Sequence, residues 1–179
     1  MHIAVADYLL ELVQNAFEAN SERTHLLLEE TTETITVKVA DTGKGMSTEV
    51  KAKALDPFST EEGKHPNRKV GLGLSFLHQA TEIANGALHV QSEEGVGTTV
   101  TATFDSTSID SPPIGDLVST FMTLLAHPKA ERLVIDRKKG EDEYTLDRQE
   151  LIGVLGDLEL VGNLHLLKAY IASQEAALN

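Results

Sequence analysis

The sequence predicts a mixed α/β (α+β) protein in which helices alternate with β-hairpins. Apolar residues recur every three or four positions in some segments and alternate in others, and turn-forming residues separate the two kinds of segment. The chain has 179 residues, of which 41% are hydrophobic, enough for one large core or two small ones. We therefore expect a globular protein.

The first part of the chain is predicted to contain two hairpins and three helices. The hairpin strands are expected at 24–29 with 34–40, and at 87–92 with 97–104. The helices are expected at 3–19, 48–54 and 70–84. Ser47 is the expected N-cap of the second helix, and Asn20 and Asn85 are the expected ends of the other two.

Two segments interrupt these patterns. Residues 56–69, DPFSTEEGKHPNRK, contain two prolines and no periodicity, and so long a loop is typical of a lid or a binding segment. Residues 106–113 are poor in apolar side chains and end in two prolines, which predicts a linker. The linker separates a first domain, 1–105, from a small α+β unit, 114–179. In this unit we expect helices at 114–126, 147–155 and 162–177, and a hairpin of strands 132–137 and 143–146.

Composition excludes several classes of function. The net charge of −13 argues against a broad nucleic-acid or anionic-membrane surface, so we expect neither partner. The absence of cysteine excludes disulfides, thiolate metal sites and thiol catalysis. No apolar run approaches the ~20 residues of a membrane helix, and no secretory signal is visible at the N-terminus. A cytoplasmic protein is the expectation.

In the first predicted helix, Glu11 and Asn15 are four residues apart and share one face. A carboxylate can orient or deprotonate a water molecule, and a carboxamide oxygen suits a hard cation such as Mg²⁺. A solvated polar face is the alternative for this pair taken alone.

The stretch VADTGKGM ends a predicted strand on Asp41 and places Gly43 and Gly45 directly after it. An ionised carboxylate there can accept a hydrogen bond from an exocyclic amine, and the two glycines allow the backbone to approach a planar ring. An ordinary strand-to-helix turn is the alternative.

Two further glycines, Gly71 and Gly73, open the predicted helix at 70–84 within KVGLGLSFL. The N–H groups at a helix N-terminus suit phosphate, and glycines there permit close approach. A basic run comes just before them, with Lys64, Arg68 and Lys69 in an otherwise acidic chain. The alternatives are a glycine-rich N-cap and a solvated loop.

The order of these motifs, closed by Gly97 and Thr98 in GVGTTV, is more specific than any one of them. With these motifs in this order, residues 1–104 resemble the nucleotide-binding domain of the GHKL superfamily. That superfamily includes gyrase-type topoisomerases, heat-shock chaperones, sensor histidine kinases and mismatch-repair ATPases. The resemblance implies an α/β sandwich of the Bergerat type, a mixed sheet with helices on one face, with ATP between the helices and the lid.

The resemblance also implies roles for individual residues, with ATP and Mg²⁺ as cofactors. Glu11 matches the general base, and Asn15 matches the ligand of the Mg²⁺ that bridges the phosphates. Asp41 matches the acceptor of the adenine amino group, and Gly43 and Gly45 match the glycines beneath the adenine.

Further matches lie around the lid. Phe58 matches the aromatic residue at the lid entrance, Gly71 and Gly73 the phosphate-facing glycines, and Thr98 the threonine near the adenine. We assign a second set to the same nucleotide site from charge, position or adjacency to these motifs: Met46, Lys64, Arg68, Lys69, Leu72 and Leu74.

Some features depart from the kinase pattern. The chain begins almost at the Glu/Asn helix, without the strand and helix that usually precede it in kinases, and Lys69 stands where many histidine kinases have glycine. No phosphoacceptor histidine lies upstream in a helical hairpin, and His127 is followed by proline. We therefore do not expect the usual autophosphorylation within this chain.

The resemblance also bears on partners. Twelve residues separate Phe58 from Gly71, and so short a lid looks like that of the kinase and anti-sigma branch. The tail with DSPPIGDL is similar to that of small stand-alone bacterial ATP-binding proteins, some of them associated with iron-hydrogenase or NADH-oxidising complexes. We expect a protein partner, either such a redox complex or a response partner, and a homodimer stays open.

Two functions of different classes follow. In the first, the protein is an enzyme that hydrolyses ATP or transfers its γ-phosphate to a partner in a regulatory role. In the second, ATP orders the lid and the C-terminal unit docks a partner, with little turnover. A degenerate member that binds no nucleotide is a third interpretation, against which Asn15 and Asp41 argue.

Overall fold

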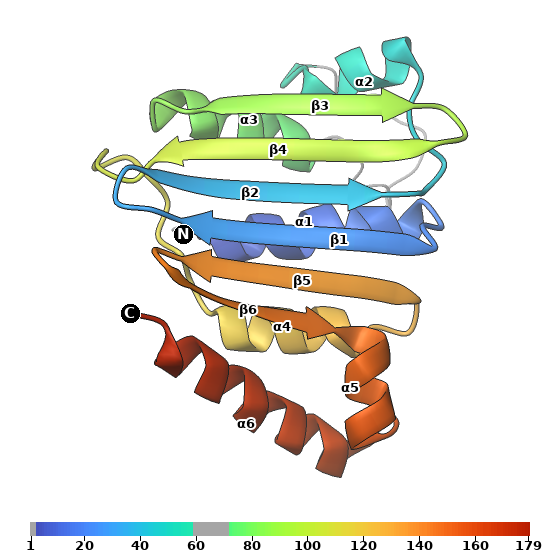
Figure 1. Cartoon of the computed structure of the whole chain (residues 1–179). Coiled ribbons are helices and arrows are strands. Elements are labelled where there is room, and N and C mark those ends of the chain that lie inside the picture. The colour runs from blue at the N-terminus through green and yellow to red at the C-terminus, as the bar shows by residue number, and fades with distance from the viewer. Residues whose placement is uncertain (1–2, 59–71) are drawn as a thin grey trace.

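The computed structural model describes residues 3–58 and 72–179, and its centre is a six-stranded sheet in the order β3-β4-β2-β1-β5-β6 (Figure 1). Strands β1 and β5 pair in parallel, and every other neighbouring pair is antiparallel. The predicted mixed sheet is therefore confirmed. The strands are β1 (Arg23–Glu30), β2 (Thr34–Asp41), β3 (Ala87–Glu93), β4 (Gly97–Asp105), β5 (Arg132–Lys139) and β6 (Asp142–Asp147).

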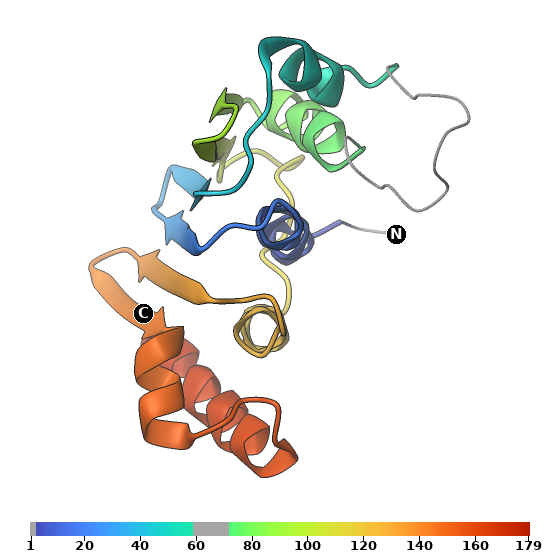
Figure 2. The same ribbon diagram turned by 90° about the vertical axis from the view of Figure 1, so that its right-hand side faces the viewer.

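The helices lie on one side of this sheet and leave its other face open, as predicted (Figure 2). Helix α1 lies behind β1 and β2, α3 behind β3 and β4, and α4 beside α1, while α5 and α6 follow at the β6 end (Figure 1). No helix in the described ranges has the length and hydropathy that a bilayer crossing requires. The helices are α1 (Val5–Glu18), α2 (Thr48–Leu55), α3 (Leu72–Ile83), α4 (Leu117–Leu125), α5 (Arg148–Leu155) and α6 (Val161–Ala177).

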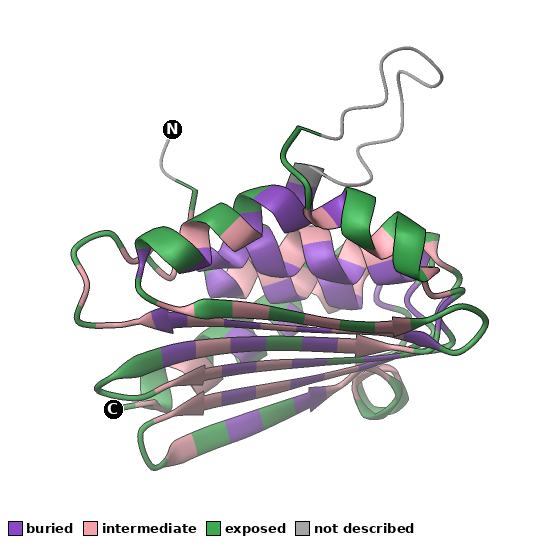
Figure 3. Ribbon diagram, turned by 90° about the horizontal axis from the view of Figure 1, so that it is seen from above, coloured by how far each residue is buried: buried purple, intermediate pink, exposed green. Residues whose placement is uncertain are grey.

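Alternating side chains assign the two faces of the sheet. On β1 the residues Thr24, Leu26 and Leu28 are buried against the helices, and on β2 the residues Val37 and Val39 are buried in the same way. Their neighbours in the sequence point to the open face, so the buried and exposed positions alternate along the strands (Figure 3). The same alternation of apolar and polar residues in the sequence predicted these strands.

Polar side chains fix where several helices begin. Ser47 accepts a hydrogen bond from the N–H of Val50 at 3.2 Å, which confirms it as the N-cap of α2. Asp116 caps α4 in the same way, through the N–H of Ser119 at 3.0 Å. Asn85, expected as the end of α3, lies just beyond it with a φ of 53°, in the left-handed region that asparagine tolerates.

The C-terminal segment of the chain belongs to the same sheet and the same core. Strand β5 adds to β1, and α4 packs beside α1, where the rings of Phe17 and His127 lie 4.8 Å apart. Residues 106–113, predicted as a linker, contain no helix or strand. The carbonyls of Pro113 and Ile114 accept hydrogen bonds from the first N–H groups of α1, those of Val5 and Ala6, at 2.8 and 2.9 Å.

A buried charge cluster holds α6 against this end of the sheet. Arg137 on β5 is only 2% exposed, and its guanidinium donates to Glu30 on β1, to Glu175 on α6 at 3.0 Å and to the carbonyl of Lys138 at 2.7 Å. The Tyr144 hydroxyl donates to Glu175 at 2.6 Å. Burial, and then the bond to Glu175, raises the pKa of Tyr144, so the phenol stays protonated and remains a donor.

Replacement of Arg137 by methionine is expected to lower the free energy of unfolding by about 3 kcal/mol, because the carboxylates of Glu30 and Glu175 would lose their counter-charge in a mostly buried position. Urea unfolding of the two proteins measures this difference. Lys138→Met is the control, since Lys138 makes an exposed pair with Glu143 and its loss should cost less than about 0.5 kcal/mol. Equal losses in the two variants would contradict the role given to Arg137.

Candidate functional site

One face of α1 carries the polar residues around which the candidate site is built. Glu11, Asn15 and Ala19 follow at intervals of four residues from the middle of α1 to its C-cap, so they lie one above another. A rise of about 1.5 Å per residue spreads these three positions over about 12 Å. Glu11 and Asn15 are both partly buried, and within the described residues the Asn15 side-chain amide makes no hydrogen bond.

At one end of this face lies the start of α3. A methyl group built on Gly73, in the first turn of α3, would lie 2.9 Å from Oε2 of Glu11 and closer still to Oε1. The carboxylate of Glu11 therefore packs directly against the Gly73 backbone. A side chain at this position would displace the carboxylate, and the structure brings these two predicted residues together.

At the other end lies the loop that follows β2. A methyl group on Gly43 would meet both the Cβ and the carbonyl oxygen of Ala19 at 2.8 Å, so Gly43 is needed where the loop crosses the end of α1. The N–H of Lys44 donates to the same carbonyl at 2.9 Å. The α1 face thus runs from Gly73 to Gly43 and connects the two glycine motifs.

Asp41 ends β2 on the helix side of the sheet, between Thr24 on β1 and Thr98 on β4 in the strand register. Its Oδ1 accepts the N–H of Gly43 at 2.8 Å. Burial raises the pKa of Asp41, and hydrogen bonds from the backbone N–H groups of Gly43 and Thr98 oppose that rise. The result is a partly buried acceptor beside two backbone donors.

Ser92 on β3 organises the floor of the same loop, and no sequence motif marked it. Its hydroxyl accepts the N–H of Met46 at 2.8 Å and lies 2.7 Å from the hydroxyl of Thr98. It also contacts the carbonyl of Gly97 at 3.2 Å. A lone serine in an alternating strand carries no signal of this kind, because the bond depends on the loop after β2 lying against β3 in the folded protein.

The remaining predicted residues differ in how far their side chains are exposed, and some lie outside the described residues. Leu74 is buried and Met46 partly buried, whereas the Phe58 side chain is 90% exposed. Leu72 is the first residue of α3. Four predicted lid residues fall outside the described residues: Lys64, Arg68, Lys69 and Gly71.

The described side chains offer no ready-made metal cage. Over residues 3–58 and 72–179, no three histidine or acidic side chains gather in a way that would hold a metal ion. A cation at this site would therefore take most of its ligands from a bound phosphate chain and from water, as Mg²⁺ commonly does. The carboxamide of Asn15, which makes no hydrogen bond to any described residue, fits such an arrangement as a single protein ligand.

Part of the chain is similar to known proteins. Residues 3–108 match the profile of a family described as histidine kinase-, DNA gyrase B- and HSP90-like ATPases. A heme sensor protein, HssS, of Staphylococcus saprophyticus is 35% identical over 95 residues, 52% of this chain and 20% of that protein. The sensor histidine kinase YvrG of Bacillus subtilis is 32% identical over 99 residues, 54% of this chain and 17% of that protein.

The chain thus spans a fifth or less of the length of these relatives. Among solved structures, the catalytic domain of the histidine kinase ThkA is 28% identical, with a TM-score of 0.44. That similarity covers 56% of this chain and 66% of the ThkA chain.

Gly45→Ala, in the loop after β2, is expected to lower the free energy of unfolding more than Gly95→Ala, in the turn between β3 and β4. Both glycines have positive φ, 65° and 81°, so each alanine meets the same backbone strain of about 1 kcal/mol. A methyl group on Gly45 would in addition collide with the carbonyl of Glu93, whereas Gly95 has nothing within 4 Å. Urea unfolding of the two variants measures the difference, and equal losses would contradict this tight contact.

Proposed function

Because the chain belongs to the family of histidine kinase-, DNA gyrase B- and HSP90-like ATPases, we propose that it binds Mg-ATP along α1 and uses the γ-phosphate in a regulatory role. It would either hydrolyse ATP or transfer the phosphate to a protein partner. The observation that carries the proposal is the polar α1 face, which runs from Gly73 at the start of α3 to Gly43 after β2. Its length, about 12 Å, is on the scale of a nucleoside triphosphate.

At the Gly43 end, Asp41 would accept the hydrogen bond of the adenine amino group. Its position between two strands holds the carboxylate in place, and the bond from the Gly43 N–H orients Oδ1. Gly43 and Gly45 carry no side chain that would cover the base. Ser92 fixes Met46 and Thr98, which would contact the adenine from the side.

At the Gly73 end, the phosphates would lie near the first turn of α3, because the N–H groups at a helix N-terminus favour an anion. Asn15 would contribute its carboxamide oxygen to Mg²⁺, which neutralises charge on the phosphates. Glu11, held against Gly73, would orient the attacking water or hydroxyl and accept its proton. We also propose that Lys64, Arg68 and Lys69 contribute charge from the lid, and that Phe58 lies at its entrance.

Asp41→Asn is expected to weaken ATP binding about tenfold or more, because the amide lacks the charge that strengthens the adenine bond. Isothermal titration with Mg-ATP measures the affinity, and ATP at 100 times Kd should stabilise the wild type by about 2.7 kcal/mol. Asp110→Asn, which makes the same charge change at an exposed position, should bind like the wild type. Unchanged binding by Asp41→Asn would refute the adenine role.

The raised pKa of Asp41 gives this binding a pH dependence of known sign. As the pH falls through that raised value, which lies above 3.8, the carboxylate is lost and ATP affinity falls. In the ligand-free protein the protonated form favours folding, so this stabilising contribution disappears as the pH rises through the same pKa. Asp41→Asn should flatten both dependences.

Glu11→Gln is expected to lower turnover at saturating Mg-ATP by about a hundredfold while ATP affinity stays within threefold of wild type, since a general base acts on the chemical step. Release of phosphate and labelling of co-purified proteins by γ-labelled ATP measure the two reactions. Glu18→Gln, an exposed acid on the same helix, is the control. If the wild type and Glu11→Gln both show only background rates and no partner is labelled, the protein is an ATP-gated binding module and not an enzyme.

A further inference from the structure

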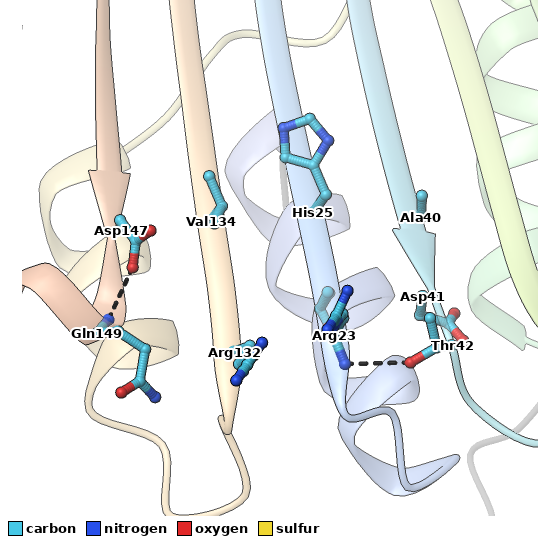
Figure 4. A pocket seen from close by; sticks show the side chains of 10 residues that line it. Arg23, His25, Ala40, Asp41, Thr42, Arg132, Val134, Asp147 and Gln149 are labelled. Carbon is cyan, nitrogen blue, oxygen red and sulfur yellow. Dashed lines mark hydrogen bonds between the residues drawn. The ribbon is translucent and has the colours of Figure 1, made fainter.

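The open face of the sheet contains a cavity of about 870 Å³ whose lining includes Asp41 of the proposed ATP site. It lies where β1 and β5 begin and β2 and β6 end, on the side away from α1 (Figure 4). Its volume falls in the range of sites for small molecules, about 300–1,000 Å³. The cavity therefore has room for a ligand of its own.

Two arginines stand side by side at this cavity. Arg23 on β1 and Arg132 on β5 are direct partners in the parallel register, and both are exposed on the open face (Figure 4). In the part of the chain that the structure describes, neither guanidinium makes a hydrogen bond or an ion pair. Arg137 and Arg148, by contrast, are bonded to a carboxylate and to a backbone carbonyl.

Like charges directly opposite each other on neighbouring strands destabilise a sheet. The chain has 28 acidic residues against 15 basic ones, so it does not lack carboxylates that could neutralise such a pair. Two acidic residues, Asp41 and Asp147, also line the cavity. Asp41 accepts the N–H of Gly43, and Asp147 accepts the N–H groups of Gln149 and Glu150 as the N-cap of α5. Two neighbouring guanidinium groups in a concave surface, with no ion pair to any described residue, are the arrangement expected of an anion site.

A third side chain is held in place beside the arginines. His25, two residues after Arg23 on the same face, has its Nε2 2.6 Å from Oδ2 of Asp136. Asp136 in turn accepts the hydroxyl of Thr145 at 2.6 Å. These bonds fix the imidazole at the wall of the cavity, where it limits the size of the ligand.

We propose that this cavity binds a small multivalent anion, with phosphate or carboxylate groups, through paired hydrogen bonds from Arg23 and Arg132. The two arginines lie outside the proposed ATP site, but the cavity meets that site at Asp41, which is part of its lining. The Thr42 hydroxyl accepts the N–H of Arg23 at 3.1 Å, and the Thr42 N–H donates to Ser21 at 3.0 Å, directly after Asp41. A ligand here therefore lies on the reverse side of the segment that carries Asp41.

The test is a titration of the ¹⁵N-labelled full chain, without ATP, with pyrophosphate in one arm and citrate in the other, at constant ionic strength. We expect saturable shifts at the amides of Arg23, His25, Arg132 and Val134 in at least one arm. Saturation by pyrophosphate assigns the site to phosphate ligands, and saturation by citrate assigns it to carboxylates. Because no nucleotide is present, the result is independent of the proposed ATPase function.

Arg132→Gln and Arg23→Gln are each expected to weaken the anion at least tenfold. Lys38→Gln, an exposed cation on the same sheet face outside the cavity, should leave it unchanged. Arg23→Lys keeps the charge and the fold but loses the planar fork, so it should bind with intermediate affinity. Shifts confined to residues 41–46 and 92–98, shifts that grow linearly at every basic residue, or equal affinity in all variants would overturn the proposal.

Discussion

The parallel pairing of β1 with β5 is the interaction on which the arrangement of the chain depends. It is the one parallel pair of the described sheet, and it joins strands about a hundred residues apart in the sequence. With β5 in place, α4 lies beside α1 and α6 is fixed to the sheet by Arg137. Helix α1 is thereby buried between the sheet and its neighbouring helices, and its polar face keeps one orientation relative to both glycine motifs.

That fixed orientation separates the two chemical ends of the candidate site. Close approach of the backbone is needed at both ends of α1, where Gly73 meets Glu11 and Gly43 meets Ala19. Between them Asn15 keeps its carboxamide without a hydrogen bond to any described residue. Helix α1 thus fixes the spacing between the residues proposed to recognise the base and those proposed to face the phosphates.

Much of this could be predicted from the sequence because the signals are local. Alternation on β2 located the strand that ends at Asp41, and Ser47 marked the start of α2 through its own hydrogen bond. The place of β5 beside β1 could not be predicted, since register between distant strands leaves no local pattern. The role of Ser92 could not be predicted either, because its bond to Met46 joins residues far apart in the sequence. The pairing of Arg23 with Arg132 likewise exists only after the sheet has formed.

The strands that follow residue 108, where the family match ends, also change what the sheet offers to other chains. Without β5, the N–H and C=O groups of β1 on that side would form an unpaired edge of the kind that recruits foreign strands and leads to aggregation. The chain instead places β5 there and moves the sheet edge outward to β6, whose residues 142–147 include three acids. The C-terminal two-fifths of the chain therefore protects β1 from such pairing as well as supporting α1, and a fragment cut at the family boundary would lose both.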